Sequence, residues 1–225
     1  MEILYEDNHL IAVNKTNSDI VQVDKTGDES LEDKIKYYIK NKYQKPGNVF
    51  LGVTHRIDRP VSGAVVFART SKALTRMNEL FVQKEVKKIY WAIVKEKPPQ
   101  ISDTLKHYIS RNQQKNISTA HDKEVKDSKL ASLTYTLLAS ADNYHLLEID
   151  LHTGRHHQIR CQLSKIGCPI KGDLKYGFPR SNPDGGISLH SRKIEFSHPV
   201  TKEKIIIVAK PPKDSLWDYF LNLIE

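Results

Sequence analysis

One aspartate flanked by arginines stands out in residues 54–63, which read THRIDRPVSG. Asp58 lies between Arg56 and Arg59, and nearby positive charge favours the ionised form of a carboxyl group. An ionised carboxylate can act as a nucleophile or as a base. The alternative is a salt-bridged turn, since turns favour Asp, Pro and Gly whatever their function. Considered alone, these residue types leave both interpretations open.

A second polar cluster, residues 152–160, reads HTGRHHQIR. Its apolar spacing predicts a helix beginning after Gly154, and the N–H groups of a helix start, joined by Arg155, form a site for phosphate or ribose. The three histidines raise the alternative of a metal-dependent hydrolase. On a helix, however, His156 and His157 would point about 100° apart, and the cluster contains no carboxylate. We therefore predict no metal site.

Basic and aromatic residues alternate with aliphatic ones in a third segment, residues 87–94, which reads KKIYWAIV. This pattern suits a groove that follows phosphates and stacks a base, although Tyr and Trp in strands are also typical of a core. The phosphate-loop motif GxxxxGK[ST] and the dinucleotide motif GxGxxG are both absent from the sequence, so we predict no nucleotide cofactor. Cys161 and Cys168 lack a metal-ligand spacing, and we expect both to be inert.

The charge of the chain is unevenly distributed. Its 225 residues carry a net charge of +8. Residues 84–129 hold 11 basic and 6 acidic side chains, and residues 155–177 hold 5 basic and 1 acidic. These two segments account for the whole excess, which indicates a localised contact with a polyanion such as RNA.

The composition also restricts the class of protein. A hydrophobic fraction of 39% supports a folded core, and we expect a single domain over residues 1–225. No apolar run is long enough to cross a bilayer, and the N-terminus lacks the pattern of a secretory signal. Two cysteines make no disulfide framework, so we predict a cytoplasmic protein, and we expect it to be a monomer.

The elements that must position these residues follow from apolar periodicity. We predict a helix capped by Ser30 with Asp33 in a capping box, a helix capped by Ser71, the helix after Gly154, and a closing helix capped by Asp214. Residues 111–128 have no apolar period and are predicted to be a loop. The predicted strands are residues 3–5, 10–13, 50–57, 63–69, 86–95, 101–109, 133–138, 144–151, 187–189, 193–196 and 204–208. Strands outnumber helices and often follow one another directly, which indicates an α+β fold with a largely antiparallel sheet.

The order of the motifs resembles the RluA-type family of RNA pseudouridine synthases. The resemblance is collinear and covers nearly the whole chain; it is carried by HRID at 55–58 with SG at 62–63, KIYWA at 88–92, TGRHHQIR at 153–160, GCPIKGD at 167–173 and LH at 189–190. It implies an α+β catalytic domain with a bent, mixed, largely antiparallel sheet, flanking helices and a basic catalytic cleft.

The resemblance also implies the reaction and the residues that carry it. The N1–C1′ bond of a uridine is cleaved, the uracil turns, and C5 is joined to C1′, without a cofactor or a metal. Asp58 is implied as the catalytic aspartate, Arg160 as its arginine partner, and Tyr90 as the tyrosine that packs on the base. Asp58 could attack C1′ or remove a proton from C2′, and both routes need an ionised carboxylate. The implied contacts to substrate come from His55, Arg56, Arg155, His157, Gln158 and Leu189.

We expect Arg56, placed on the same strand face as Asp58, to fill the space vacated when the uridine leaves the base stack. The substrate is expected to be ribosomal or transfer RNA. The alternative is a non-catalytic RNA-binding or chaperone protein on the same fold, which retention of a carboxylate in a cationic cleft disfavours. Residues 14–18 read NKTNS where the family usually shows Lys-Pro-x-Gly, and Val61 stands where Thr is common. We expect no S4-type RNA-binding domain before the catalytic domain.

Overall fold

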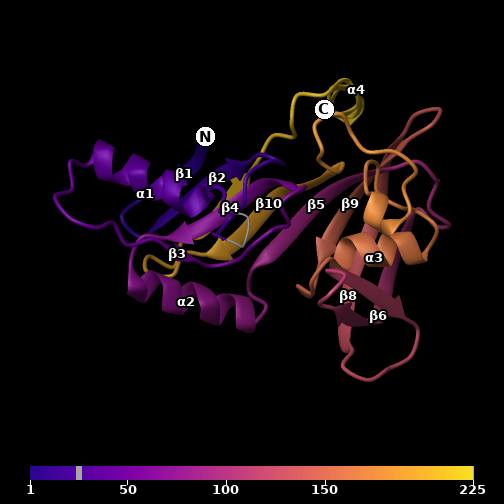
Figure 1. Ribbon diagram of the computed structural model, residues 1–225, viewed down its shortest axis with the longest axis horizontal. Helices are drawn as coiled ribbons and strands as arrows, with labels where there is room; N and C mark the ends of the chain where they lie inside the picture. Colours follow the sequence, from indigo (N-terminus) through magenta and orange to yellow (C-terminus); the bar gives the residue numbers. More distant parts are fainter. Residues whose placement is uncertain (24–26, 225) are drawn as a thin grey trace. The chain divides into compact units, whose positions relative to one another are not determined.

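The computed structural model describes residues 1–23 and 27–224 (Figure 1). By its internal contacts the chain divides into two compact units. Unit 1 comprises Met1–Val86 and Ser191–Lys210, and unit 2 comprises Lys87–His190 and Pro211–Glu225. Within the described ranges, no helix is long and apolar enough to span a membrane. The assignment of residues 1–225 to one catalytic domain stays a prediction.

Unit 1 is built on a sheet whose strands alternate their side chains between two helices. Leu10 and Ala12 pack with α2 (Ser71–Val82), whereas Ile11 and Val13 pack with α1 (Leu31–Lys42), because successive side chains of a strand point to opposite faces. Figure 1 shows the two helices on opposite sides of this sheet. The strand order is β1 (Glu2–Glu6), β2 (Leu10–Lys15), β4 (Ser62–Ala68) and β10 (Leu189–Ser197), with β3 (Gly52–Val53) on β4 and β11 (Lys204–Val208) on β10. The strand predicted at 187–189 is wrong except for Leu189, which belongs with the predicted strand 193–196 to one strand, β10.

Side chains cap the helices where the sequence predicts, with one difference. The capping box of α1 is confirmed, since Ser30 Oγ accepts from Asp33 N and the Asp33 carboxylate accepts from Ser30 N. The cap of α2 is Thr70, whose Oγ1 accepts from Ala73 N, so the predicted cap Ser71 is wrong by one position. Asp214 caps the closing helix α4 (Ser215–Ile224) as predicted.

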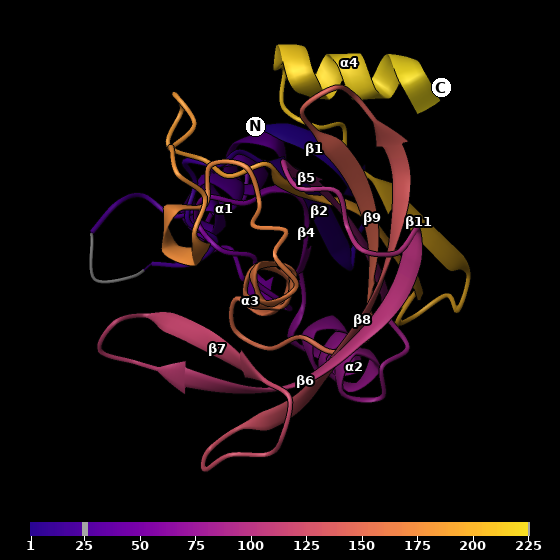
Figure 2. The same cartoon turned by 90° about the vertical axis from the view of Figure 1, so that its right-hand side faces the viewer.

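Unit 2 is an antiparallel sheet with a helix on each face. Its strands lie in the order β5 (Lys87–Val94), β9 (His145–Leu151), β8 (Lys129–Ser140), β6 (Ser102–Asn112) and β7 (Ile117–His121). Trp217 and Phe220 of α4 pack on Trp91 and Ile93. The helix α3 (Gln158–Lys165) contacts β6 and β7, as Figure 2 shows. The predicted α+β fold with a largely antiparallel sheet is confirmed.

The strand predicted at residues 50–57 is wrong in length, because β3 contains only Gly52 and Val53. Beyond Val53, side chains replace the backbone ladder: Thr54 Oγ1 donates to Val66 O at 2.7 Å, and Val66 N donates to His55 Nε2 at 3.1 Å. Residues 54–58 are therefore irregular, and the expectation that Arg56 and Asp58 share a strand face is wrong.

The loop predicted at residues 111–128 is also wrong, since it contains the end of β6 and all of β7. The buried positions of β7 are Ser118 and Ala120, which are too small or too polar to register as an apolar period. Ser118 N donates to Tyr176 Oη at 2.8 Å, which satisfies a backbone group at this sheet edge.

Candidate active site

The segment that carries Asp58 is held by a buried lysine. Lys15, at the end of β2, is 1% exposed, and its Nζ donates to the carbonyl oxygens of Arg59 at 2.9 Å, Val61 at 2.7 Å and Thr16 at 2.8 Å. The carbonyl of Asp58 accepts from Val61 N at 3.0 Å, which closes a tight turn. Two of the three hydrogen bonds of this ammonium group therefore fix the backbone directly after Asp58, and the third goes to the neighbouring residue Thr16.

Burial lowers the pKa of Lys15 to about 7, while the negative charges of Asp19 and Asp58 act in the opposite direction. Lys15 was not predicted to be functional from the sequence, in which residues 14–18 only depart from the pattern Lys-Pro-x-Gly. The available signal was a lysine at the end of a strand whose preceding residues are all apolar but one. Thr16 Oγ1 donates to the Asp19 carboxylate at 2.7 Å, so a side-chain bond holds the turn that follows.

Gly63 fixes the other end of the Asp58 segment. Its φ is +115°, and a Cβ atom at this position would collide with the backbone of Ser191 in β10. Only glycine permits this close approach of β4 to β10. The turn after Asp58 is thus fixed at both ends inside unit 1.

His55 and Arg56, both predicted to contact substrate, have different surroundings. The His55 ring accepts from Val66 N and packs on Phe81, with ring centroids 5.2 Å apart, so this residue also supports the fold. Arg56 is exposed, and among the residues that the structure describes it has no hydrogen-bond or ion-pair partner. Arg59 is exposed and pairs with Asp28 at 2.8 Å. Of the two arginines, Arg56 is therefore better placed than Arg59 to bind a phosphate of a ligand.

Tyr90 lies on β5 with 7% of its surface exposed. It pairs in register with Ile149, which pairs with Tyr135, so these three side chains share one face of the unit 2 sheet. Leu189, at the start of β10, is also buried. The contacts of Tyr90 and Leu189 with substrate stay predictions.

The predicted start of the third helix is wrong, because α3 begins at Gln158 and not after Gly154. Gln158 Oε1 accepts from Arg155 N at 3.0 Å and from Thr153 Oγ1 at 2.8 Å, and its Nε2 donates to Ser132 O at 3.1 Å. The Arg155 N–H is thus used inside the protein, and the phosphate or ribose site at the start of this helix stays a prediction. The Arg155 side chain is exposed, and its Nε donates to a backbone carbonyl.

The histidines of this segment form hydrogen bonds within the protein. The rings of His156 and His157 are stacked with centroids 3.8 Å apart, so the expectation that they diverge by about 100° along a helix is wrong. His156 Nδ1 bonds with Ser118 Oγ at 2.8 Å, and His157 Nδ1 bonds with Tyr176 Oη at 2.9 Å. His152 bonds instead with Ser132 Oγ at 3.2 Å. Within the described residues, no group of three or more His, Cys, Asp or Glu is arranged to hold a metal ion.

Protonation of His157 should destabilise the fold. Burial and the nearby Arg160 charge lower its pKa from 6.5 to about 2, so below pH 6.5 the unfolded chain binds a proton that the folded chain does not. Stability is therefore lost as pH falls, by about 2 kcal/mol between pH 6.5 and pH 5. Urea unfolding at several pH values measures this slope.

His157→Asn is the matched variant, since asparagine tolerates the left-handed φ of 51° at this position. We expect the pH dependence of its unfolding free energy to be shallower than that of the wild type between pH 6.5 and pH 5. An identical pH dependence in the two proteins would refute a neutral, buried His157.

Arg160 forms a buried ion pair that the sequence analysis missed. Its Nε lies 2.7 Å from Asp173 Oδ2 and its Nη2 lies 2.8 Å from Asp173 Oδ1, in a two-pronged geometry. Arg160 is 4% exposed and Asp173 1%. The guanidinium also lies over the Tyr176 ring, 5.0 Å from its centroid. The signal was Asp173 in the motif GCPIKGD, and the pairing of Arg160 with Asp58 stays a prediction.

Both cysteines are free and buried. Burial raises the pKa of the Cys161 thiol to about 12 and that of the Cys168 thiol to about 11. Because the thiolate is the reactive form, these groups are unreactive at neutral pH, as predicted.

Comparison with known proteins identifies the family. Residues 9–165 match the family model described as RNA pseudouridylate synthase. The chain is 32% identical over 212 residues to ribosomal large subunit pseudouridine synthase C of Rickettsia prowazekii, covering 93% of this chain and 68% of that protein. It is 30% identical over 240 residues to tRNA pseudouridine synthase C of Haemophilus influenzae, covering 99% of this chain and 97% of that protein.

Solved structures show the same fold. The human protein RNA pseudouridylate synthase domain containing 4 superposes with a TM-score of 0.80 at 23% identity, covering 99% of this chain and 92% of that chain. The human protein RNA pseudouridylate synthase domain containing 1 superposes with a TM-score of 0.72 at 22% identity, covering 99% of this chain and 94% of that chain. The family model and the two bacterial relatives show that the chain belongs to the RNA pseudouridylate synthase family. It is an RNA pseudouridine synthase, which is an isomerase.

Proposed function

We propose that this isomerase converts uridines of ribosomal or transfer RNA to pseudouridine, with Asp58 as the catalytic carboxylate. The observation that carries the proposal is the fixed backbone directly after Asp58, held by the buried Lys15 ammonium. A buried lysine is costly, and here its donors hold one short segment whose distinctive side chain is a carboxylate. The two bacterial relatives act on ribosomal and transfer RNA respectively, by their names.

The reaction assigns a task to each residue of the catalytic set. Cleavage of the N1–C1′ bond builds positive charge on the sugar and negative charge on uracil, so an ionised Asp58 at the anomeric centre lowers the barrier. Arg160 keeps that carboxylate ionised by charge pairing. Tyr90 stacks on the uracil while it turns, and assists removal of the C5 proton. Two routes are open to this carboxylate: it attacks C1′, or it removes a proton from C2′.

The remaining predicted substrate residues divide by exposure. Arg56 and Arg155 are exposed, and we propose that they contact RNA directly, with Arg56 occupying the space left by the flipped uridine. His55, His157, Gln158 and Leu189 are half-buried or buried, and we propose that they act mainly by positioning their segments. We also propose that this protein acts in the cytoplasm and as a monomer.

Loss of the Lys15 ammonium should reduce turnover without weakening RNA binding. Lys15→Met keeps the unbranched side chain up to the fourth heavy atom but leaves the carbonyls of Arg59 and Val61 without their donor. We expect a loss of about 1–3 kcal/mol in stability and a fall in kcat of roughly 10- to 100-fold, because a displaced carboxylate no longer meets the reacting atom. The dissociation constant for RNA should stay unchanged, since Lys15 is buried.

Lys34→Met is the control for Lys15→Met. Lys34 pairs with Asp19 at 2.7 Å, but its side chain is 38% exposed, so its loss should change stability by less than about 1 kcal/mol. The assay compares kcat, dissociation constant and urea unfolding of both variants. Equal kcat values for Lys15→Met and Lys34→Met would contradict the positioning of Asp58 by Lys15.

The choice of RNA is tested by mapping pseudouridines in the ribosomal and transfer RNA of cells that lack this chain. We expect at least one site to be lost and then restored by the wild-type gene, but not by Asp58→Asn. Restoration by Asp58→Asn would favour the alternative, a non-catalytic RNA-binding or chaperone protein that assists another enzyme.

A further inference from the structure

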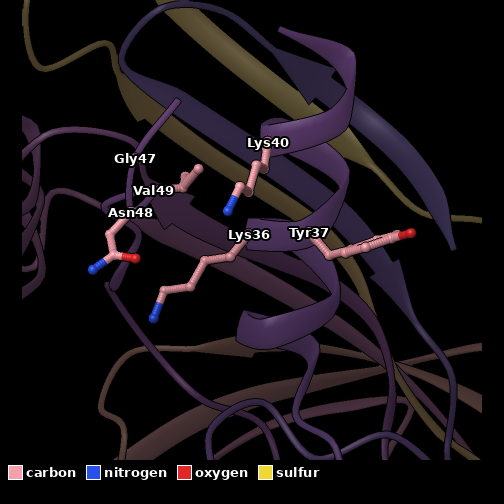
Figure 3. A pocket seen from close by; sticks show the side chains of 6 residues that line it. All are labelled: Lys36, Tyr37, Lys40, Gly47, Asn48 and Val49. Atoms are coloured by element: carbon pink, nitrogen blue, oxygen red, sulfur yellow. The ribbon is translucent and has the colours of Figure 1, made fainter. Parts of the chain in front are cut away.

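A basic pocket lies on α1 in unit 1, outside the proposed catalytic set. It has a volume of about 350 Å³ and is lined by Lys36, Tyr37, Lys40, Gly47, Asn48 and Val49 (Figure 3). Figure 3 shows Lys36 and Lys40 extending from the helix toward Asn48 and Val49, while Tyr37 points away from them. The lining contains two lysines and no acidic residue, and Glu32 is the acidic residue that pairs with Lys36.

Two exposed polar side chains of this pocket differ from the neighbouring lysines of the same helix in their protein partners. Lys34 pairs with Asp19, and Lys42 pairs with Glu6. By contrast, Lys40 and Asn48 have no side-chain hydrogen bond or ion pair to any residue that the structure describes. Among the described residues, Lys40 is thus the one lysine of α1 without an acidic partner.

Lys36 adds a second cation one helical turn from Lys40. Residues four apart on a helix are neighbours, so both ammonium groups can reach one anion. Lys36 pairs with Glu32 at 2.5 Å, but its side chain is 36% exposed, and such a pair within a helix is weak. A phosphate can therefore replace Glu32 as the partner of Lys36 at little cost.

We propose that this pocket binds a backbone phosphate of the substrate RNA, on a part of the strand other than the modified uridine. Two ammonium groups and an amide are donors that suit phosphate oxygens. A protein partner is disfavoured, since two of the lining residues are lysines and lysine is depleted at protein interfaces. The inference rests on the proposed function, because it takes the RNA substrate as given.

The test measures RNA binding and turnover of Lys40→Gln against Lys45→Gln. Lys45 is an exposed lysine near the pocket but not in its lining, so its loss removes the same charge from the same region. For an RNA transcript that contains the modified site, Lys40→Gln should weaken binding about three- to tenfold. It should also reduce the slope of log affinity against log salt by about 0.7, the share of one phosphate on single-stranded RNA.

Turnover separates this site from the catalytic one. Neither lysine belongs to the proposed catalytic set, so kcat at saturating RNA should be unchanged, whereas KM should rise for Lys40→Gln alone. Asn48→Ala should weaken binding in the same direction, which guards against an effect of helix stability in Lys40→Gln. Uridine 5′-monophosphate and inorganic phosphate serve as small probes, and both should bind more weakly than 1 mM.

Two results would overturn the inference: equal affinity and salt slope for Lys40→Gln and Lys45→Gln, or micromolar binding of uridine 5′-monophosphate that RNA does not displace. The wild-type protein is assayed first for pseudouridine formation. If it forms none, the proposed function fails. If it forms pseudouridine and the two lysine variants behave alike, only the pocket inference fails.

Discussion

Arg160→Ala should cost about 3–5 kcal/mol of folding free energy, the largest loss of stability that we expect from a single side chain here. The reason is that Asp173, 1% exposed, would remain as a buried charge without its partner. Asp173→Leu should destabilise the protein to a similar extent, because it leaves the buried positive charge of Arg160 without its partner. Urea unfolding at pH 7 measures both losses.

The double variant Arg160→Met with Asp173→Leu distinguishes structure from catalysis. It replaces both charges by apolar side chains of broadly similar size, so most of the lost stability should return, because a buried pair replaced by apolar residues is often neutral or stabilising. Turnover should not return, since the proposed partner of Asp58 is gone. A double variant with wild-type turnover would show that Arg160 has only a structural role.

The control for Arg160→Ala lies on the same helix. Lys165 pairs with Asp122 at 2.9 Å, but their side chains are 38% and 70% exposed. Lys165→Met should therefore change stability by less than about 1 kcal/mol. If Arg160→Ala were as mild as Lys165→Met, the ion pair with Asp173 would not hold the fold as described.

Asp58→Asn should lower turnover by at least about 10⁴-fold while the fold and RNA binding persist. Asparagine has nearly the same shape but can neither attack C1′ nor accept a proton. Affinity for RNA should be equal or higher, because one negative charge near the RNA is removed. Nucleoside analysis of treated RNA gives turnover, and urea unfolding gives stability.

Asp28→Asn removes the same charge from an exposed position in the same unit, where Asp28 pairs with Arg59. We expect its turnover to stay within about twofold of the wild type, since exposed pairs contribute little. Turnover of Asp58→Asn equal to that of Asp28→Asn would remove Asp58 from the chemistry.

Local patterns predicted most of the fold. Leu10–Lys15 and Ser62–Ala68 are strands because apolar residues run through both, and α1 follows from Ser30 and Asp33 in capping-box positions. The motif HRID was predicted to carry the chemistry, and the catalytic role of Asp58 stays a prediction. Such features depend on neighbours within a few residues, so the sequence displays them.

Features that depend on distant partners could not be predicted. β7 has no apolar period, because Ser118 is buried through its bond to Tyr176 Oη, far along the chain. The late start of α3 depends on the left-handed conformation of His157, which the stacking on His156 and the bond to Tyr176 hold in place. Lys15 gains its role only because the backbone at Arg59 and Val61 folds over it.

We propose above all that this chain replaces the N1–C1′ bond of an RNA uridine by a C5–C1′ bond. Release of tritium from transcripts of ribosomal and transfer RNA labelled at C5 of uridine tests it directly, since C5 must lose its hydrogen when it bonds to C1′. We predict tritium release by the purified protein in at least one transcript, with an equal number of pseudouridines formed and no free uracil. Free uracil, or no release from either transcript, would contradict the account.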